Sequence, residues 1–113
     1  MQMIVAYVQP FMASDVVHAL HQVDGVTGAT FTEVRGFGGG RRTDVPVPEV
    51  LYGTVGKMRV EVVVRDSLVV PVVEAIRAAA RTGHRGDGRI FVLPVVRGVK
   101  IMTGTVSEGE DSP

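Results

Sequence analysis

Cysteine is absent from this sequence, and so are a net charge and any long apolar run. Without cysteine, the chain can form neither disulfides nor thiolate metal sites. No apolar stretch approaches the roughly 18 residues that a membrane-spanning helix needs. The first residues also lack the basic stretch, apolar core and cleavage site of a secretory leader. We therefore expect a soluble, cytoplasmic protein that does not insert into a membrane.

The lack of net charge bears on the kind of ligand. Twelve basic and twelve acidic residues balance one another, whereas a nucleic-acid binder needs a basic surface that neutralises phosphates. Nucleic acid is therefore not an expected partner. The basic residues do gather locally, at Arg41 and Arg42 and between Arg81 and Arg89. Local clusters on a neutral chain favour a small anionic ligand.

The length and the apolar content suit one compact domain, since 45% of the 113 residues are hydrophobic. We place this domain at residues 1–104. Residues 105–113 include three acidic side chains, one glycine and one proline, and we expect them to form a flexible acidic tail.

Apolar periodicity predicts two helices and five strands. The predicted helices cover residues 15–23, with Ser14 as N-cap, and 68–82, with Ser67 as N-cap and Gly83 as the C′ residue. The predicted strands cover residues 3–9, 27–35, 57–65 and 89–96, with a short last strand at 99–103. The order βαββαβ predicts an α+β, ferredoxin-like fold in which both helices lie on one face of an antiparallel sheet.

Two helices can cover only one side of such a sheet. The strands at 3–9 and 89–96 are apolar on both sides, because Val5 and Tyr7 alternate with Ile4 and Ala6 in the first of them. The second face needs another cover, and further copies of the chain supply it most simply. The pattern therefore predicts a homo-oligomer.

The loop between the second helix and the fourth strand, residues 82–89, holds three glycines together with Arg85 and Arg89. Glycines let backbone N–H groups approach an anion closely, and arginine supplies paired hydrogen bonds to phosphate. We interpret this loop as a candidate phosphate site. An ordinary helix-to-strand loop, in which glycine and charge are also common, is the alternative.

A second glycine-rich run, from Gly36 to Arg42, opens a long loop over residues 36–56. The run matches neither a Walker loop nor a dinucleotide fingerprint, so by itself it indicates a hinge more than a ligand contact. Irregular loops of this length are usually functional in a small domain. Arg41 and Arg42 are candidates for a second small anion near the loop base, and plain solvation of both is the alternative.

The residues form no recognisable catalytic constellation. No serine occupies a nucleophile elbow, and Glu61 shares its strand face with Lys57 and Arg59, which is typical of cross-strand ion pairs. His18 and His21 stand three residues apart on the polar side of the first helix. That spacing suits a solvated helix face better than a metal site. We expect neither an enzyme nor an obligatory cofactor or metal.

Several segments together carry a family resemblance. Val34-Arg35-Gly36-Phe37-Gly38 follows the second strand, and Ala80-Arg81-Thr82-Gly83 is followed by Gly86-Asp87-Gly88-Arg89-Ile90-Phe91-Val92. Lys100-Ile101-Met102-Thr103-Gly104 ends the pattern. These segments resemble the signature regions of the PII signal-transduction family (nitrogen regulatory protein PII). The resemblance covers about residues 3–104, and the long loop corresponds to the family's T-loop.

The resemblance implies a homotrimer that binds an adenine nucleotide in clefts between subunits. ADP or ATP is the implied ligand, with AMP as a further candidate. The T-loop would control a partner, for which a membrane transporter is favoured and a regulated enzyme is the other choice. By position, the implied nucleotide-binding residues are Gly36, Phe37 and Gly38 at the loop base, Val63 beside the adenine, Gly86, Gly88, Arg89 and Lys100 at the phosphates with Asp87 among them, and Gly28 and Thr30 from the adjacent subunit.

The chain departs from the family pattern in ways that make it a divergent, PII-like member. Gly40 stands where the family usually has a glutamine that helps to bind magnesium and 2-oxoglutarate, which disfavours 2-oxoglutarate sensing in the usual mode. Met102 stands where a second phosphate-binding arginine is common, which favours ADP or AMP over ATP. Tyr52 is out of register with the family's modified tyrosine, which disfavours uridylylation.

Two other functions stay open at this stage. A metal-linked trimer of the related CutA-like type would need ligands at its clefts, and the histidine pair lies on a helix face instead. A small hydrolase on a ferredoxin-like scaffold would need a base or a nucleophile. The sequence offers no clear candidate for either group.

Overall fold

The computed structural model describes residues 1–37 and 53–113. Four residues singled out above as ligand candidates or departures, Gly38, Gly40, Arg41 and Arg42, lie outside the described residues, as does Tyr52. Within the described ranges, no helix is both long and apolar enough to cross a membrane.

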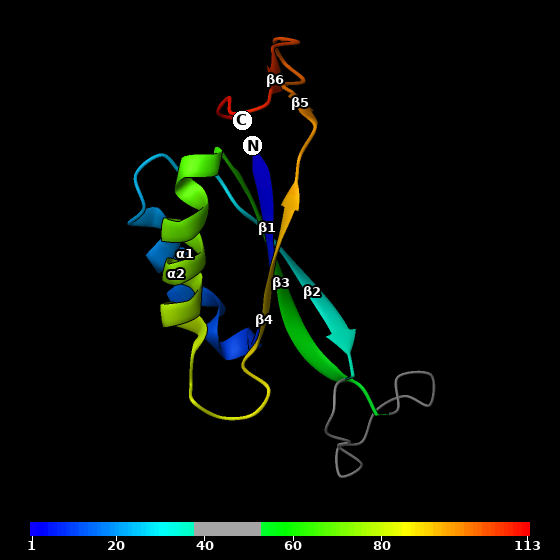
Figure 1. Ribbon diagram of the computed structural model, residues 1–113. Helices are drawn as coiled ribbons and strands as arrows, with labels where there is room; N and C mark the ends of the chain where they lie inside the picture. Colours follow the sequence, from blue (N-terminus) through cyan, green and yellow to red (C-terminus); the bar gives the residue numbers. More distant parts are fainter. Residues whose placement is uncertain (38–52) are drawn as a thin grey trace.

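Four strands form one antiparallel sheet, and two helices lie against one of its faces (Figure 1). The order across the sheet is β2-β3-β1-β4, and every neighbouring pair is antiparallel. This arrangement confirms the predicted ferredoxin-like α+β fold. In chain order the elements are β1 (Gln2–Val8), a 3-10 turn (Pro10–Met12), α1 (Ala13–His21), β2 (Thr30–Gly36), β3 (Val55–Val64), a second 3-10 turn (Asp66–Leu68), α2 (Val69–Ala80) and β4 (Gly88–Pro94).

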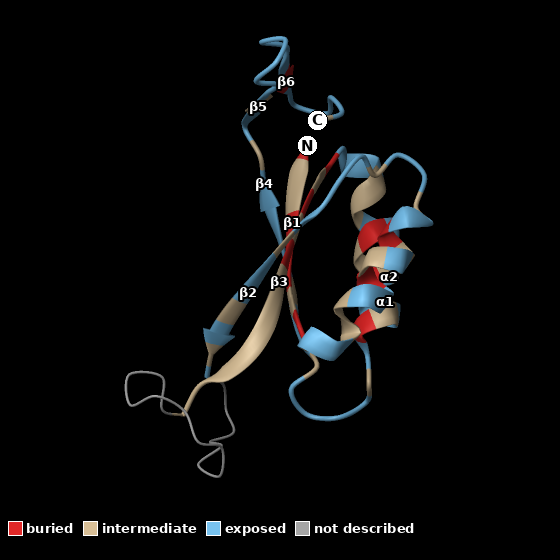
Figure 2. Ribbon diagram, turned by 180° about the vertical axis from the view of Figure 1, so that it is seen from behind, coloured by how far each residue is buried: buried red, intermediate tan, exposed pale blue. Residues whose placement is uncertain are grey.

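The core lies between the helices and the sheet. Alternate residues of β1 and β3 point to the helical side, and one face of each helix meets them, as the buried residues in Figure 2 show. This is the burial expected from a period of two in the strands and 3.6 in the helices. The fully or nearly fully buried members are Ile4, Ala6, Val8, Val16, Leu20, Val60, Val62, Val64, Val72, Ile76 and Ala80.

The opposite face of the sheet lacks a covering layer in the described chain. Phe91 and Leu93 stand in register with Val5 and Met3 on this open face. Their side chains are 48% and 41% exposed, although both are large and apolar. The second face of the sheet is therefore apolar, as the sequence predicted, and it is exposed in the single chain.

Both helices begin one or two residues away from the predicted serine caps. Ser14 and Ser67 lie inside turns of helical backbone, and the residues that precede the helices, Met12 and Leu68, make no side-chain cap. In each case a 3-10 turn runs directly into the helix, so that carbonyls upstream accept the first amides (Met12 N to Gln9 O, 2.9 Å). The serine caps were therefore wrong, because the preceding turn satisfies donors that a cap would otherwise take.

The second helix also ends earlier than predicted, at Ala80 instead of Thr82. Arg81 already has an extended conformation, with φ −73° and ψ 123°. The amides of Thr82 and Gly83 donate to the carboxylate of Asp87 at 2.9 Å each. Gly83 is therefore not the C′ residue, although its φ of +86° suits glycine.

The predicted last strand at 99–103 was wrong. The chain instead forms a separate two-stranded sheet of β5 (Arg97–Val99) and β6 (Val106–Glu108), joined by a turn through residues 100–105. Gly104, at φ +71°, closes that turn with a bond from its amide to Lys100 O at 2.7 Å. Residues 106–108 are paired, in contrast to the flexible tail expected from residue 105. The domain boundary at 104 stays a prediction.

The small β5–β6 sheet is fastened to the start of the chain (Figure 1). The amino group of Met1 donates to Asp66 Oδ1 at 2.7 Å and to the carbonyl of Gly109. The hydrogen bond from the amino group lowers the pKa of Asp66 below its ordinary value. One charged group thereby joins three segments that are distant in sequence.

Candidate functional site

A groove of about 630 Å³ opens where the open face of the sheet meets the two glycine-rich segments. Strands β1, β2, β3 and β4 and the loop before β4 all contribute to it. Its lining includes four basic residues and, among the described residues, no acidic one. The lining residues are Tyr7, Val34, Arg35, Gly36, Phe37, Val55, Lys57, Arg59, Gly86, Gly88, Arg89 and Phe91.

Strand register explains why three of the polar residues meet. Tyr7 of β1 is paired with Arg59 of β3 on one side and with Arg89 of β4 on the other. Residues that are opposite one another in register point to the same face. The Arg59 guanidinium lies over the Tyr7 ring, 5.7 Å from its centroid, within the range of a cation–π contact.

Arg59 is held on its own strand by Glu61, whose Oε1 lies 2.8 Å from Arg59 Nε. The two atoms are close but poorly aligned, so that the buried Nε has no hydrogen-bond partner among the described residues. We treat the contact as an ion pair without hydrogen-bond geometry. Both side chains are about one-third exposed, so solvent screens the attraction.

The two glycines of the loop before β4 permit a close approach that a larger residue would prevent. At Gly88, with φ +108°, an added Cβ would lie 1.7 Å from the carbonyl oxygen of Tyr7. At Gly86, with φ +91°, an added Cβ would meet Gln9 Nε2 at 2.9 Å. The loop therefore lies directly against the end of β1, at the edge of the groove.

Asp87 holds this loop in shape from within. Its carboxylate accepts the amides of Thr82 and Gly83 and the hydroxyl of Thr82. Hydrogen bonding to Thr82, first through the hydroxyl, lowers the pKa of Asp87 below its ordinary value. Both carboxylate oxygens therefore accept hydrogen bonds within the loop. The role of Asp87 in this structure is to hold the shape of the loop.

Lys57 and Arg35 connect the groove to neighbouring backbone. Lys57 Nζ donates to the carbonyl of Gly86, which links β3 to the glycine loop. Arg35 donates through Nε and Nη2 to the hydroxyl and carbonyl of Thr54, each at 3.0 Å. The loop base and the glycine loop are thus both tied to basic side chains of the groove.

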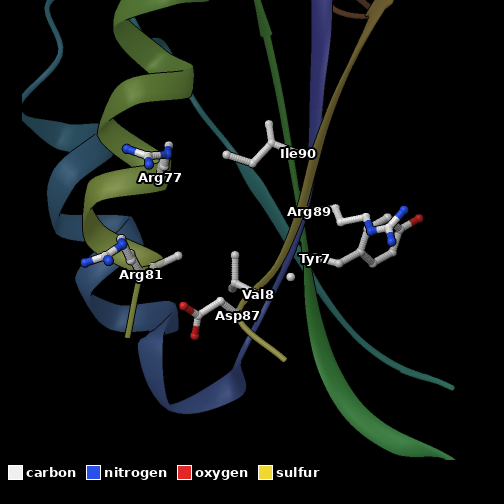
Figure 3. A pocket seen from close by; sticks show the side chains of 9 residues that line it. Tyr7, Val8, Arg77, Arg81, Asp87, Arg89 and Ile90 are labelled. Atoms are coloured by element: carbon white, nitrogen blue, oxygen red, sulfur yellow. The ribbon is translucent and has the colours of Figure 1, made fainter. Parts of the chain in front are cut away.

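Beneath the glycine loop, on the helical side, lies a second, smaller pocket of about 230 Å³ (Figure 3). Arg77 and Arg81 lie on its α2 side, whereas the Arg89 side chain lies with Tyr7 on the other side of β4. Arg89 lines both this pocket and the larger groove, and its side chain lies on the Tyr7 side of β4, away from the two helix arginines.

Five of the residues implied by the family resemblance meet in the larger groove: Gly36, Phe37, Gly86, Gly88 and Arg89. Asp87 lies next to them in the glycine loop.

The remaining implied residues lie elsewhere on the chain. Val63 and Lys100 line a pocket of about 300 Å³ beside the β5–β6 sheet. Gly28 lines another, of about 430 Å³, between α1 and the approach to β2, and Thr30 begins β2. Within one chain, the implied residues therefore lie in separate groups and not in a single site.

Sequence reasoning missed four polar groove residues: Tyr7, Arg35, Lys57 and Arg59. The alternation along 57–65 did place Lys57 and Arg59 on one strand face. What it lacked was the register that sets Arg59 beside Tyr7 and Arg89. Among the described residues, no three of His, Cys, Asp or Glu lie close enough together to hold a metal ion.

The fold and the groove define a small α+β protein with a groove lined by basic residues next to the end of β2 and the start of β3. Comparison with known proteins shows the family to which the chain belongs. The family model for nitrogen regulatory protein P-II matches residues 1–105. The chain therefore belongs to the nitrogen regulatory protein P-II family, which confirms the resemblance read from its motifs.

Curated relatives agree over nearly the whole chain. A nitrogen regulatory protein P-II of Azospirillum brasilense is 44% identical over 106 residues, 92% of this chain and 94% of the relative. One from Haemophilus influenzae is 42% identical over 114 residues, 99% of each chain. Nitrogen regulatory protein P-II 1 of Escherichia coli is 42% identical over 106 residues. Membership in this family identifies the chain as a regulatory protein and not an enzyme.

Proposed function

We propose that this chain is a nucleotide-responsive regulator whose groove binds the phosphates of ADP or ATP, with AMP as a further candidate. One observation carries the proposal. Four basic residues and two glycines with positive φ line a single groove, and no acidic residue shares the lining among the described residues. Such a surface suits a compact polyanion.

We further propose that the functional unit is a homotrimer with the nucleotide held between neighbours. The groove lies at one end of the sheet, whereas Val63 and Lys100 lie near the β5–β6 sheet at the other end (Figure 1). The resemblance assigned Gly28 and Thr30 to the adjacent subunit, and because Val63 and Lys100 line a separate pocket on this chain, we place them with that pair. A second copy that presents these four residues to the groove would complete the implied set. The exposed apolar residues of the open face support such an association.

In this proposal the loop over 36–56 carries the signal to a partner, for which a membrane transporter is favoured over a regulated enzyme. Met102, 92% exposed in the turn after Lys100, offers no charge to an outer phosphate. We therefore expect ADP to bind at least as well as ATP. Because Gly40 lacks a side-chain ligand, we expect no response to 2-oxoglutarate in the usual mode.

Isothermal titration with ADP, ATP and AMP tests the ligand. Arg89→Ala should lower the affinity for ADP about tenfold or more, because it removes a charge-assisted contact to phosphate. Arg77→Ala is the matched control, since it removes a side chain of the same type that lies on the α2 side of β4. The absence of heat with all three nucleotides contradicts the proposal, and equal losses in both variants contradict the role of Arg89.

A further inference from the structure

Arg59 lies in the middle of β3, on the open face of the sheet. Its neighbours Met58 and Val60 pack in the core under the helices, so the alternation of the strand turns Arg59 to the other side. It is paired in register with Tyr7 of β1, which is paired in turn with Arg89 of β4. Because neighbouring strands lie roughly 5 Å apart, the backbones of the two arginines are about 10 Å apart. Two arginines thus border one groove from opposite sides of Tyr7.

Two neighbours hold the Arg59 side chain in place. Its guanidinium lies over the Tyr7 ring, 5.7 Å from the centroid, where the electron-rich face of the ring attracts a cation. Its Nε lies 2.8 Å from Oε1 of Glu61, two residues further along the same strand face. Both contacts restrict the guanidinium before a ligand arrives, so that less conformational freedom is lost when it binds.

The outer end of this guanidinium has no partner in the described part of the chain. Arg59 Nε is buried, whereas the side chain as a whole is 35% exposed, so the exposure lies on other atoms. Neither Nη1 nor Nη2 of Arg59 donates a hydrogen bond to any described residue. Two Nη groups held in one plane match two oxygens of a phosphate.

The groove therefore offers two separate places for phosphate. On one side of Tyr7, Arg89 lies beside the glycine loop with its positive-φ residues Gly86 and Gly88. On the other side, the free Nη groups of Arg59 stand apart from that loop. A single phosphate held by Arg89 and the loop leaves the Nη groups without an acceptor, and a second phosphate on the same ligand supplies one.

We propose that Arg59 is a further phosphate-binding residue, which holds a second phosphate of the ligand while Arg89 and the glycine loop hold the first. Tyr7 and Glu61 are the positioning residues for its guanidinium. The inference rests on the proposed nucleotide function, and it makes the number of phosphates the property that the groove distinguishes. ADP uses both arginines, whereas AMP uses Arg89 alone.

Calorimetric titration of the full-length protein with ADP, and with AMP by displacement of ADP, tests this assignment. Arg59→Met should lower the affinity for ADP about tenfold or more, because a charge-assisted pair of hydrogen bonds is lost, and should leave that for AMP within about twofold. Arg59→Lys keeps the charge without the planar fork, so we expect an intermediate loss for ADP of about threefold. Arg77→Met is the matched control on α2 and should change neither affinity.

The role of the ring is measured with a conservative pair of variants. Tyr7→Leu removes the aromatic face beneath the guanidinium and should lower the affinity for ADP about two- to fivefold, with AMP unchanged. Tyr7→Phe keeps that face and should bind both nucleotides as wild type does. Equal ADP affinities in Tyr7→Leu and Tyr7→Phe would show that the ring does not position Arg59.

The comparison of the two nucleotides separates this inference from the function on which it rests. Equal losses for ADP and AMP in Arg59→Met, or no loss for either, overturn the second phosphate contact. If Arg59→Met does not fold, the ratio of the two affinities in Arg59→Lys decides in the same way. If wild-type protein binds none of the nucleotides, the proposed function fails and this inference fails with it. If wild type binds them and the Arg59 variants keep its preference for ADP over AMP, this inference alone fails.

Discussion

Gly88 shows how a single residue sets the edge of the groove. With φ +108°, a Cβ added to Gly88 would lie 1.7 Å from the Tyr7 carbonyl oxygen, which leaves no room for any side chain. The glycine lets the loop end directly on β1, where Gly88 pairs with Val8. The backbone at this position of the family motif therefore requires glycine, because any Cβ would clash with the Tyr7 carbonyl.

Gly88→Ala should destabilise the protein by on the order of 3 kcal/mol, because it combines a left-handed backbone with a clash against main chain. Chemical denaturation at matched protein concentration measures the change. Gly98→Ala is the control, since its Cβ would make only ordinary contact with Met1, at 3.7 Å. We expect that control to remain within about 0.5 kcal/mol of wild type. Similar stabilities for the two variants would show that the loop relaxes freely.

Asp87 should make the stability of the glycine loop depend on pH. Its pKa is lowered in the folded chain, mainly by the hydrogen bond from Thr82. A lowered pKa stabilises the fold above the ordinary value of 3.8, and that stabilisation disappears as the pH falls through the folded value. Wild type should therefore exceed Asp87→Asn in unfolding free energy at neutral pH, and the gap should narrow as the pH falls below 3.8. A gap of constant size from pH 7 to pH 3 would contradict the role of the carboxylate.

At the scale of the elements, the periodicity of apolar residues predicted the strands and helices. It missed the helix ends, because each of these depends on a single local contact. The alternation of β1 and β3 and the apolar stripes of the helices predicted the sheet, the layers and the core. The start of α1 was missed because the turn at Pro10–Met12 takes the place of a cap. The end of α2 was missed because Asp87, six residues beyond Arg81, accepts the amides that a longer helix would use.

The site was predicted in part for the same reason. The glycines and arginines in the loop before β4 indicated a candidate anion site by composition alone. The other half of the groove depends on register, since Arg59 lies beside Tyr7 only through the pairing of β1 with β3. No local pattern encodes that pairing, and the Arg35 contact to Thr54 likewise spans 19 positions.

The attachment of the β5–β6 sheet makes a prediction at this scale. Asp66→Asn removes the charge that faces the amino group of Met1 and should loosen the adjoining carbonyl contact at Gly109. Amide exchange at residues 106–109 should quicken about two- to fivefold, as expected for one solvent-screened pair. Glu74→Gln, an exposed acid on α2, serves as comparison. Equal exchange in both variants would show that β5–β6 pairing alone holds this sheet.

At the scale of the whole molecule, the two faces of the sheet differ, because one carries both helices and the other is open within the described residues. Both helices pack on one face, where the buried valines of β3 lie. On the other face, Leu93 stands opposite Met3 and Phe91 opposite Val5, and both β4 side chains are large, apolar and half-exposed. A contiguous apolar surface of this kind is typical of an interface. The groove opens at the end of the same face, so that the proposed association and the proposed ligand site would share one surface.

Leu93→Lys should therefore dissociate the proposed trimer, because the change places a charge within the apolar centre of the interface. Sedimentation equilibrium of wild type should give three times the chain mass, and the variant should move toward the monomer. Val70→Lys, which alters a 70% exposed side chain on α2, is the matched control and should remain trimeric. If Leu93→Lys remains a trimer, the open face is not the interface, and the two groups of ligand residues must be brought together by another surface. If it dissociates and also loses ADP binding while Val70→Lys keeps both, the nucleotide site is completed by the neighbouring chain.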